Sequence, residues 1–98
     1  MQTINSSEFN DFISSGKKVV QFSATWCGPC KMLSRTLENF DVEGVEIAKL
    51  DIDESRDLAM QFGVRSVPLL VVFENGEEVR RSPGAKPYQE VIKFVEGE

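Results

Sequence analysis

The chain has 98 residues, of which 41% are hydrophobic and 28% are charged, and its net charge is −5. Such a composition is ordinary for a globular protein, so we expect residues 1–98 to form one domain with its own core. The negative charge argues against nucleic acid as a main partner, because phosphate binding depends on clustered Lys and Arg. No apolar run approaches the length of a membrane span, and the polar N-terminus lacks a signal-peptide pattern. We therefore expect a cytoplasmic protein that does not contact a membrane.

The first strand and helix are predicted near the N-terminus. Residues 2–5 have a weak strand pattern. The following helix is expected to be capped by Ser6 or Ser7 and to end at Gly16. The apolar side chains that share one face of this helix are Phe9, Phe12 and Ile13.

The next strands and helices alternate in the same way. Residues 18–24 have the apolar composition of a buried strand, and residues 28–40 have helical periodicity. The predicted apolar stripe of that helix consists of Met32, Leu33, Thr36, Leu37 and Phe40. Residues 45–52 form a third strand pattern, and a short helix that ends at Gly63 follows. The inward side chains of the short helix are Leu58, Ala59 and Phe62.

The C-terminal part of the chain predicts a hairpin and a last helix. Residues 68–73 are the most apolar run, and Asn75-Gly76 is a strong two-residue turn that pairs this run with residues 77–81. Pro87 begins a helix whose apolar face is formed by Tyr88, Val91, Ile92 and Val95. Strand–helix–strand units predict parallel strands covered on both faces, and the hairpin adds antiparallel ones.

Both cysteines lie in one short motif, which reads Trp26-Cys27-Gly28-Pro29-Cys30-Lys31. If the motif opens a helix, Cys27 and Cys30 lie on the same face, since residues three apart are neighbours there. Cys27 then lies among unpaired backbone N–H groups at the positive end of the helix dipole, which stabilises a thiolate. The thiolate is the form that attacks disulfides, so the motif indicates a reactive disulfide. Because the helix turns the second thiol inward, we expect Cys27 to be exposed and Cys30 to be shielded.

Other interpretations of the two cysteines are weaker. A structural disulfide stabilises more when it closes a long loop, and a bridge from Cys27 to Cys30 closes almost none. A zinc site normally needs four ligands, and the chain has two cysteines and no histidine. Two inert buried thiols remain an alternative, although Gly28-Pro29 between them marks an exposed turn. The sequence predicts no bound metal and no cofactor.

The chain resembles the thioredoxin family over nearly its whole length. The segments that carry the resemblance, in the family's order and spacing, are residues 26–32, 49–53, 62–68, 73–76 and 84–85. The resemblance implies the thioredoxin fold, which is an α/β fold with a central mixed sheet of about five strands flanked by about four helices. The Cys-Gly-Pro-Cys form of the motif is itself specific.

The resemblance also implies roles for particular residues. Cys27 corresponds to the attacking nucleophile and Cys30 to the resolving thiol, and Pro68 corresponds to a cis-proline beside the motif. The residues implied in substrate binding are Trp26, Gly28, Pro29, Val67, Pro68, Gly84 and Ala85. Val67 is expected to offer its backbone to an extended substrate segment.

The chain departs from the family at three positions. Gln21 stands where members usually have a buried Asp that is thought to accept the proton of the resolving cysteine, and Gln cannot titrate. Lys49 resembles the lysine beside that Asp, so Gln21 and Lys49 form the expected surroundings of proton transfer. Ser23 replaces a frequent aromatic residue, and Arg35 replaces a helix-bending Pro.

Together these features predict a thiol–disulfide oxidoreductase that reduces protein disulfides through Cys27 and Cys30. Its expected partners are disulfide-containing proteins and a thioredoxin reductase or another thiol donor, and we expect a monomer. The alternative is a thioredoxin-like binding subunit of a larger complex with incidental redox activity, because a fold alone does not define a function. An oxidant or isomerase would differ in redox potential, and Gly28-Pro29 favours a reductase.

Overall fold

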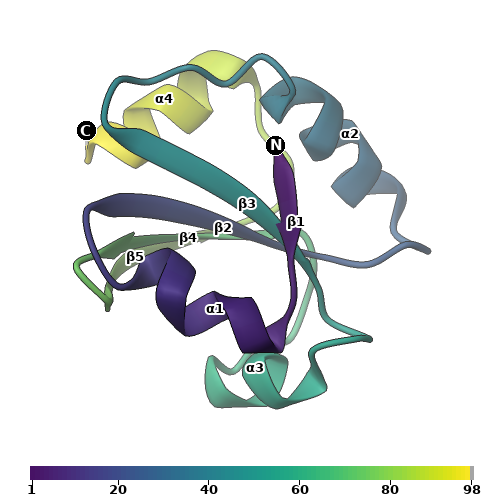
Figure 1. The fold of residues 1–98 in the computed structure, drawn as a ribbon. Coiled ribbons are helices and arrows are strands. Elements are labelled where there is room, and N and C mark those ends of the chain that lie inside the picture. The colour runs from purple at the N-terminus through teal and green to yellow at the C-terminus, as the bar shows by residue number, and fades with distance from the viewer. Residues whose placement is uncertain (98) are drawn as a thin grey trace.

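The computed structural model describes residues 1–97, in which five strands and four helices alternate in the predicted order (Figure 1). In chain order these are β1 (Gln2–Ile4), α1 (Ser6–Ile13), β2 (Lys17–Ser23), α2 (Gly28–Leu37), β3 (Val45–Asp51), α3 (Arg56–Gln61), β4 (Leu69–Glu74), β5 (Glu77–Pro83) and α4 (Tyr88–Glu96). The strand boundaries differ only slightly from those predicted from the sequence.

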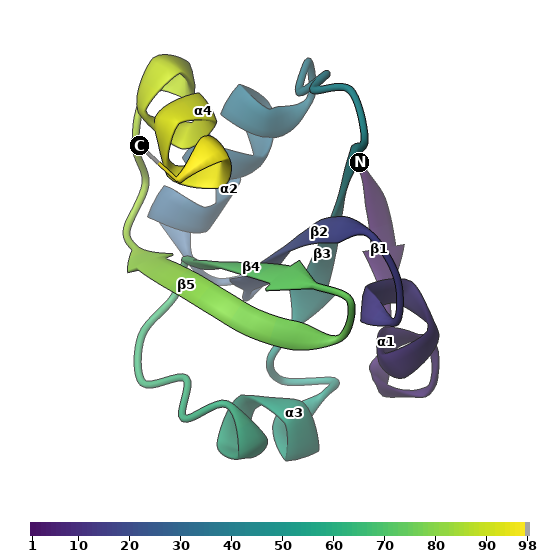
Figure 2. The same cartoon turned by 90° about the vertical axis from the view of Figure 1, so that its left-hand side faces the viewer.

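The five strands form one mixed sheet in the order β1-β3-β2-β4-β5. β1 and β2 both run parallel to β3, whereas β4 is antiparallel to β2 and β5 is antiparallel to β4. Parallel neighbours need a crossover connection, which α2 supplies between β2 and β3. Helices α2 and α4 cover one face of the sheet, and α1 and α3 cover the other (Figures 1 and 2). The predicted α/β class with a mixed five-stranded sheet is confirmed.

The sheet divides the hydrophobic core into two layers, because successive side chains of a strand point to opposite faces. In β4, the residues in the layer of α1 and α3 are Leu69, Val71 and Phe73, and those in the layer of α2 and α4 are Leu70 and Val72. The neighbouring strand β2 places one polar side chain, that of Gln21, in a fully buried position. A buried amide is tolerated only when it is hydrogen-bonded, so Gln21 needs partners inside the protein.

Helix α1 begins with a reciprocal pair of hydrogen bonds. Asn5 Oδ1 accepts from the Glu8 backbone N–H at 3.1 Å, and Glu8 Oε1 accepts from the Asn5 backbone N–H at 3.0 Å. The prediction that Ser6 or Ser7 caps this helix is therefore wrong, since both serines lie inside it. Asn and Ser are about equally good caps, so the Glu three residues after Asn5 decides which residue takes the position.

Helix α2 ends at Leu37, earlier than the periodicity predicted. Leu33 and Leu37 are buried against the sheet, and Phe40 packs against the same layer beyond the end of the helix. Met32 is 62% exposed, so its assignment to the apolar stripe is wrong. Met32 is rotated about 100° around the helix axis from Leu33, which places it beside the line of contact rather than on it.

The turn between β4 and β5 agrees with the predicted hairpin. Asn75 and Gly76 have φ angles of +50° and +91°. Positive φ at both central residues gives the turn a twist that matches the right-handed twist of the two strands. Asn75 also accepts a hydrogen bond from the Gly16 N–H through its side chain at 2.9 Å, which joins the hairpin to the start of β2.

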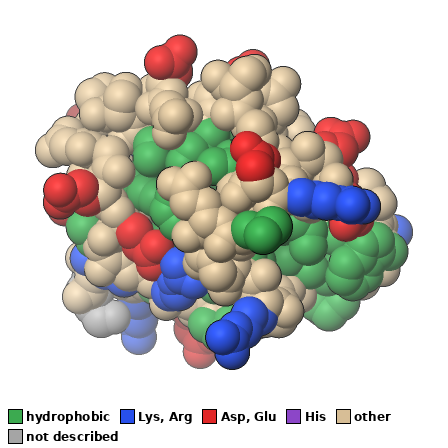
Figure 3. Space-filling view, turned by 90° about the horizontal axis from the view of Figure 1, so that it is seen from below, with side chains coloured by type: hydrophobic (Ala, Val, Ile, Leu, Met, Phe, Trp, Pro, Cys, Tyr) green, Lys and Arg blue, Asp and Glu red, His purple; other side chains and the backbone are tan. Residues whose placement is uncertain are grey.

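The surface carries charges of both signs between small hydrophobic groups. On the side of α1 and α3, hydrophobic side chains appear in separate groups among acidic and basic ones (Figure 3). The large hydrophobic side chains that are exposed are Met1, Trp26, Met32, Met60 and Val79. Within residues 1–97, no helix has the length and apolar character needed to span a lipid bilayer.

Candidate active site

The two cysteines form a disulfide at the N-terminus of α2, directly after the loop that leaves β2. Their Cα atoms are 5.2 Å apart. Cys27 is the N-cap of the helix, and its Sγ accepts a hydrogen bond from the Cys30 backbone N–H at 3.1 Å. Pro29 lies in the first turn of α2, where a backbone N–H has no partner within the helix, so the missing N–H of proline costs no hydrogen bond. A sulfur atom therefore occupies the place of a capping oxygen, where unpaired N–H groups stabilise negative charge on Cys27 once the disulfide is reduced.

Both cysteines are largely buried in this disulfide form. The exposed fraction is 6% for Cys27 and 1% for Cys30, so the expectation of an exposed Cys27 is wrong here. The cause is a small apolar cluster in which Ala24, Ile52 and Val67 pack around the pair. Cys27 is nevertheless the more accessible of the two sulfur-bearing residues.

The loop before β4 lies against the disulfide. Cys27 Sγ is 3.7 Å from the carbonyl oxygen of Val67, and the peptide bond between Val67 and Pro68 is cis. The Gly84 N–H donates to the Pro68 carbonyl oxygen at 2.9 Å, and Gly84 has a φ of +85°, which glycine adopts without a steric cost. Ala85 follows and is exposed. The structure thus places Val67 beside Cys27 and joins Pro68 to Gly84, although these predicted substrate-binding residues come from two distant segments.

The other predicted substrate-binding residues surround the disulfide on its exposed side. Trp26 is 68% exposed, and Gly28 and Pro29 are exposed as well. The indole N–H of Trp26 donates to the Asp53 carboxylate at 2.8 Å. Sequence reasoning did not single out Asp53 for the site. The available signal was that Asp53 belongs to residues 49–53, one of the segments that carry the resemblance.

Gln21 lies directly behind Cys30. Its Nε2 donates to the Cys30 carbonyl oxygen at 3.2 Å and lies 3.3 Å from Ser34 Oγ, and the Ser34 hydroxyl lies 3.4 Å from Gln21 Oε1. Lys49 is half-buried and is the register partner of Gln21 across the β2–β3 ladder. Sequence reasoning missed Ser34, and its position four residues after Cys30 on the same helix face was the available signal.

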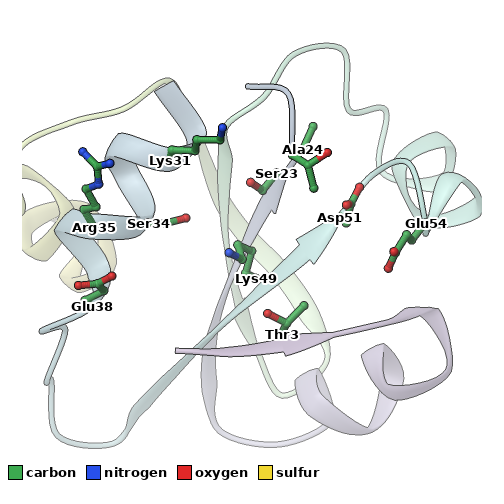
Figure 4. A pocket seen from close by; sticks show the side chains of 11 residues that line it. Thr3, Ser23, Ala24, Lys31, Ser34, Arg35, Glu38, Lys49, Asp51 and Glu54 are labelled. Atoms are coloured by element: carbon green, nitrogen blue, oxygen red, sulfur yellow. The ribbon is translucent and has the colours of Figure 1, made fainter. Parts of the chain in front are cut away.

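An open pocket of about 720 Å³ lies between α2 and β3 (Figure 4). Ser34 and Lys49 both line it, and their side chains point into the same hollow. The other charged residues of its wall are Lys31, Arg35, Glu38, Asp51 and Glu54. Among residues 1–97, no three His, Cys, Asp or Glu side chains are arranged to hold a metal ion.

One cation lies beside Gly84. The Lys86 ammonium donates to the Gly84 carbonyl oxygen at 3.3 Å. Partial burial lowers the pKa of Lys86 below its usual range, and the negative charge of Glu90 opposes this shift. Lys86 therefore places a partly desolvated positive charge next to Gly84.

A disulfide between cysteines three positions apart, at a helix N-terminus after a buried strand, is the reactive centre of a thiol–disulfide oxidoreductase. The reaction of this class needs only a thiolate, a disulfide and a second thiol. The Cys27–Cys30 pair supplies the two protein sulfurs, and the exposed surface beside them is open to a partner.

Comparisons with known proteins agree with this class. The family model described as Thioredoxin matches residues 1–97. The thioredoxin of Chlamydia muridarum is 46% identical over 97 residues, which cover 97% of this chain and 95% of that protein. The thioredoxin of Staphylococcus saprophyticus is 43% identical over 96 residues, which cover 95% and 92%. A mutant thioredoxin from Halobacterium salinarum NRC-1 matches the structure with a TM-score of 0.88 and 33% identity, covering 98% of this chain and 89% of that one.

The chain belongs to the thioredoxin family. It is a thiol–disulfide oxidoreductase that reduces protein disulfides through its active-site cysteine pair.

Proposed function

We propose that this reduction proceeds by a two-step exchange in which Cys27 attacks and Cys30 resolves. The observation that carries the proposal is the position of Cys27 Sγ as the N-cap of α2, with the Cys30 N–H donating to it at 3.1 Å. This position stabilises a thiolate on Cys27 and on no other side chain of the motif. The larger exposed fraction of Cys27, 6% against 1% for Cys30, supports the same order of reaction.

In the first step the Cys27 thiolate forms a bond to one sulfur of the substrate disulfide, and the other substrate sulfur leaves with the electron pair and takes up a proton. In the second step Cys30, after giving up its proton, bonds to Cys27, and the remaining substrate sulfur leaves as a thiolate. Gln21 has no group that titrates, so the Cys30 proton must pass to another acceptor, which is water or a group of the substrate. Lys49 lines the pocket on this side of the motif. Its positive charge favours the Cys30 thiolate that forms when the proton leaves.

The substrate is proposed to lie as an extended segment along the loop that contains Val67. The residues proposed to contact it are Trp26, Gly28, Pro29, Val67, Pro68, Gly84 and Ala85. The backbone of Val67 faces Cys27 and serves as the hydrogen-bonding edge for this segment. Short backbone pairing suits substrates of many sequences, because it does not depend on their side chains.

The oxidised pair must be reduced again after each cycle. We propose a thioredoxin reductase or another thiol donor for this step, a cytoplasmic location in which such donors keep thiols reduced, and a monomer as the working form. Residues 1–98 are proposed to act as one domain. Nothing in the comparisons favours the alternative of a binding subunit.

The test follows the reduction of a disulfide-bonded protein substrate with dithiothreitol as the electron donor. We expect the wild-type chain to accelerate the reaction and Cys27→Ser to abolish the acceleration. Cys30→Ser is expected to accumulate a stable mixed disulfide at Cys27, which mass spectrometry of the intact complex detects. The roles would be reversed if the Cys27→Ser variant accumulated a mixed disulfide on Cys30 and the Cys30→Ser variant accumulated none on Cys27.

A further inference from the structure

A buried amide and a hydroxyl connect the first turns of α2 to the central strand β2. Gln21 is fully buried, and its Nε2 donates to the Cys30 carbonyl oxygen at 3.2 Å. The Ser34 hydroxyl donates to Gln21 Oε1 at 3.4 Å and lies 3.3 Å from Nε2. Cys30 and Ser34 are four residues apart in α2, so both lie on the helix face that meets β2.

The Cys30 carbonyl determines the orientation of the amide. A carbonyl oxygen only accepts hydrogen bonds, so the atom of Gln21 that faces it is the nitrogen. Gln21 Oε1 then faces Ser34, and the single hydroxyl hydrogen of Ser34 satisfies it. If this hydroxyl is removed, Oε1 loses its partner in the core and the preference for the present orientation weakens.

Ser34 stands at the boundary between this buried amide and the open pocket. It is half-buried and lines the pocket of about 720 Å³, whereas Gln21 is not exposed at all. The pair contains no charge, so it holds Cys30 without changing its own protonation during the reaction. A neutral pair also avoids the cost of burying an ion in this position.

We propose that Gln21 and Ser34 are positioning residues that hold Cys30 for the second step of the exchange. The proposal rests on the roles proposed for Cys27 and Cys30. In that step the Cys30 sulfur bonds to the Cys27 sulfur, the bond from Cys27 to the substrate breaks, and its electron pair leaves on the substrate sulfur. The Cys30 proton goes to water or to a substrate sulfur.

The pair acts on the second step because its hydrogen bond to the motif goes to Cys30 and not to Cys27. When Cys27 is bonded to a substrate, the approach of Cys30 depends on where the first turn of α2 lies relative to β2. Small displacements of reacting groups cost large factors in rate. Cys27 precedes the helix, and its own N–H donates to the Ala24 carbonyl oxygen at 3.3 Å, so its position has a support that does not involve Gln21 or Ser34.

The test separates the two steps in stopped-flow mixing of the reduced full chain with a chromophoric aromatic disulfide. Each step releases one coloured thiol. The first release depends on the reagent concentration, and the second is a concentration-independent step within the protein. We expect Ser34→Ala to slow the second release about three- to tenfold, the kinetic equivalent of one hydrogen bond, and to leave the first release unchanged. Ser34→Thr keeps the hydroxyl and is expected to restore the wild-type rate.

Thr36→Ala is the matched control. Thr36 is also half-buried on α2, but its hydroxyl donates to the Met32 carbonyl oxygen of the same helix at 3.2 Å. We expect this variant to release both thiols at wild-type rates. The proposal is overturned if Ser34→Ala resolves as fast as the wild type, if it slows both releases equally, or if Ser34→Thr is as slow as Ser34→Ala. A wild-type chain that shows no concentration-independent release would instead refute the role proposed for Cys30.

Discussion

Replacing Gln21 by Glu puts a carboxyl group of the same shape into the core behind Cys30. At neutral pH the variant cannot donate to the Cys30 carbonyl oxygen, which now accepts the Gln21 Nε2 hydrogen bond at 3.2 Å. Two acceptors then face each other in a site with no exposure to solvent. The Ser34 hydroxyl can still donate to the carboxylate, which offsets part of the loss.

The magnitude follows from these contacts. The Cys30 carbonyl oxygen also accepts within the backbone ladder of α2, so the cost comes from a buried charge that has no charged partner and faces another acceptor, about 3–5 kcal/mol. Burial raises the pKa of the new Glu above its value of about 4.3 in the unfolded chain. The penalty is therefore complete above the folded-state pKa and vanishes below the unfolded one. Between them, the difference in unfolding free energy from the wild type changes by about 1.4 kcal/mol per pH unit.

The assay is urea unfolding of the disulfide form at several values between pH 4 and pH 8, with Gln89→Glu as the control. Gln89 is exposed on α4, so we expect its variant to stay within about 0.5 kcal/mol of the wild type at every pH. Gln21→Glu should approach the wild type near pH 4 and lose stability as the pH rises. Equal stability of Gln21→Glu and wild type at pH 8 would refute the buried, hydrogen-bonded position of this side chain.

Three further outcomes are expected. Alkylation of the reduced protein should label Cys27 before Cys30, as peptide mass spectrometry can show. Equal labelling would mean that the accessibility of the two thiols does not support Cys27 as the attacking residue. Asn5→Ala should lower the unfolding free energy by about 1–2 kcal/mol through the loss of the helix cap, and an unchanged thermal midpoint would contradict the reciprocal bonds of α1. The hydrogen bond from Arg81 lowers the pKa of Glu78, so its contribution is present at neutral pH and is lost as the pH falls through the folded-state pKa. Glu78→Gln should therefore cost at most about 1 kcal/mol at pH 7 and nothing near pH 2, whereas a cost that persists in acid would point to a role other than the ion pair.

Regular patterns in the sequence were sufficient to predict the elements and their order. The unbroken apolar run from Leu69 to Phe73 is typical of a strand that is buried on both faces, and the spacing of Leu33 and Leu37 marks the buried face of α2. Both patterns can be recognised in the sequence alone. The turn at Asn75-Gly76 was equally predictable, since few residues tolerate positive φ at both positions.

Contacts between distant segments were harder to predict. Whether Met32 faces the core depends on how α2 sits on the sheet, and the burial of Cys27 depends on Val67, which lies in another loop. Ser34 gave no signal in isolation, because its significance arises only when β2 brings Gln21 beside it. Its spacing from Cys30 was visible, but spacing does not reveal which buried polar group lies opposite.

The capping sulfur makes one backbone amide a reporter of the redox state. In the disulfide form the Cys30 N–H donates to a neutral sulfur at 3.1 Å. After reduction and loss of the proton, the same N–H faces a full negative charge, and such charge-assisted bonds are shorter and stronger. The first turn of α2 is then held more tightly, so hydrogen exchange at this amide should slow and its proton resonance should move downfield. A single peak in a ¹⁵N-correlated spectrum could thus follow electron uptake by the protein in real time, without any added probe.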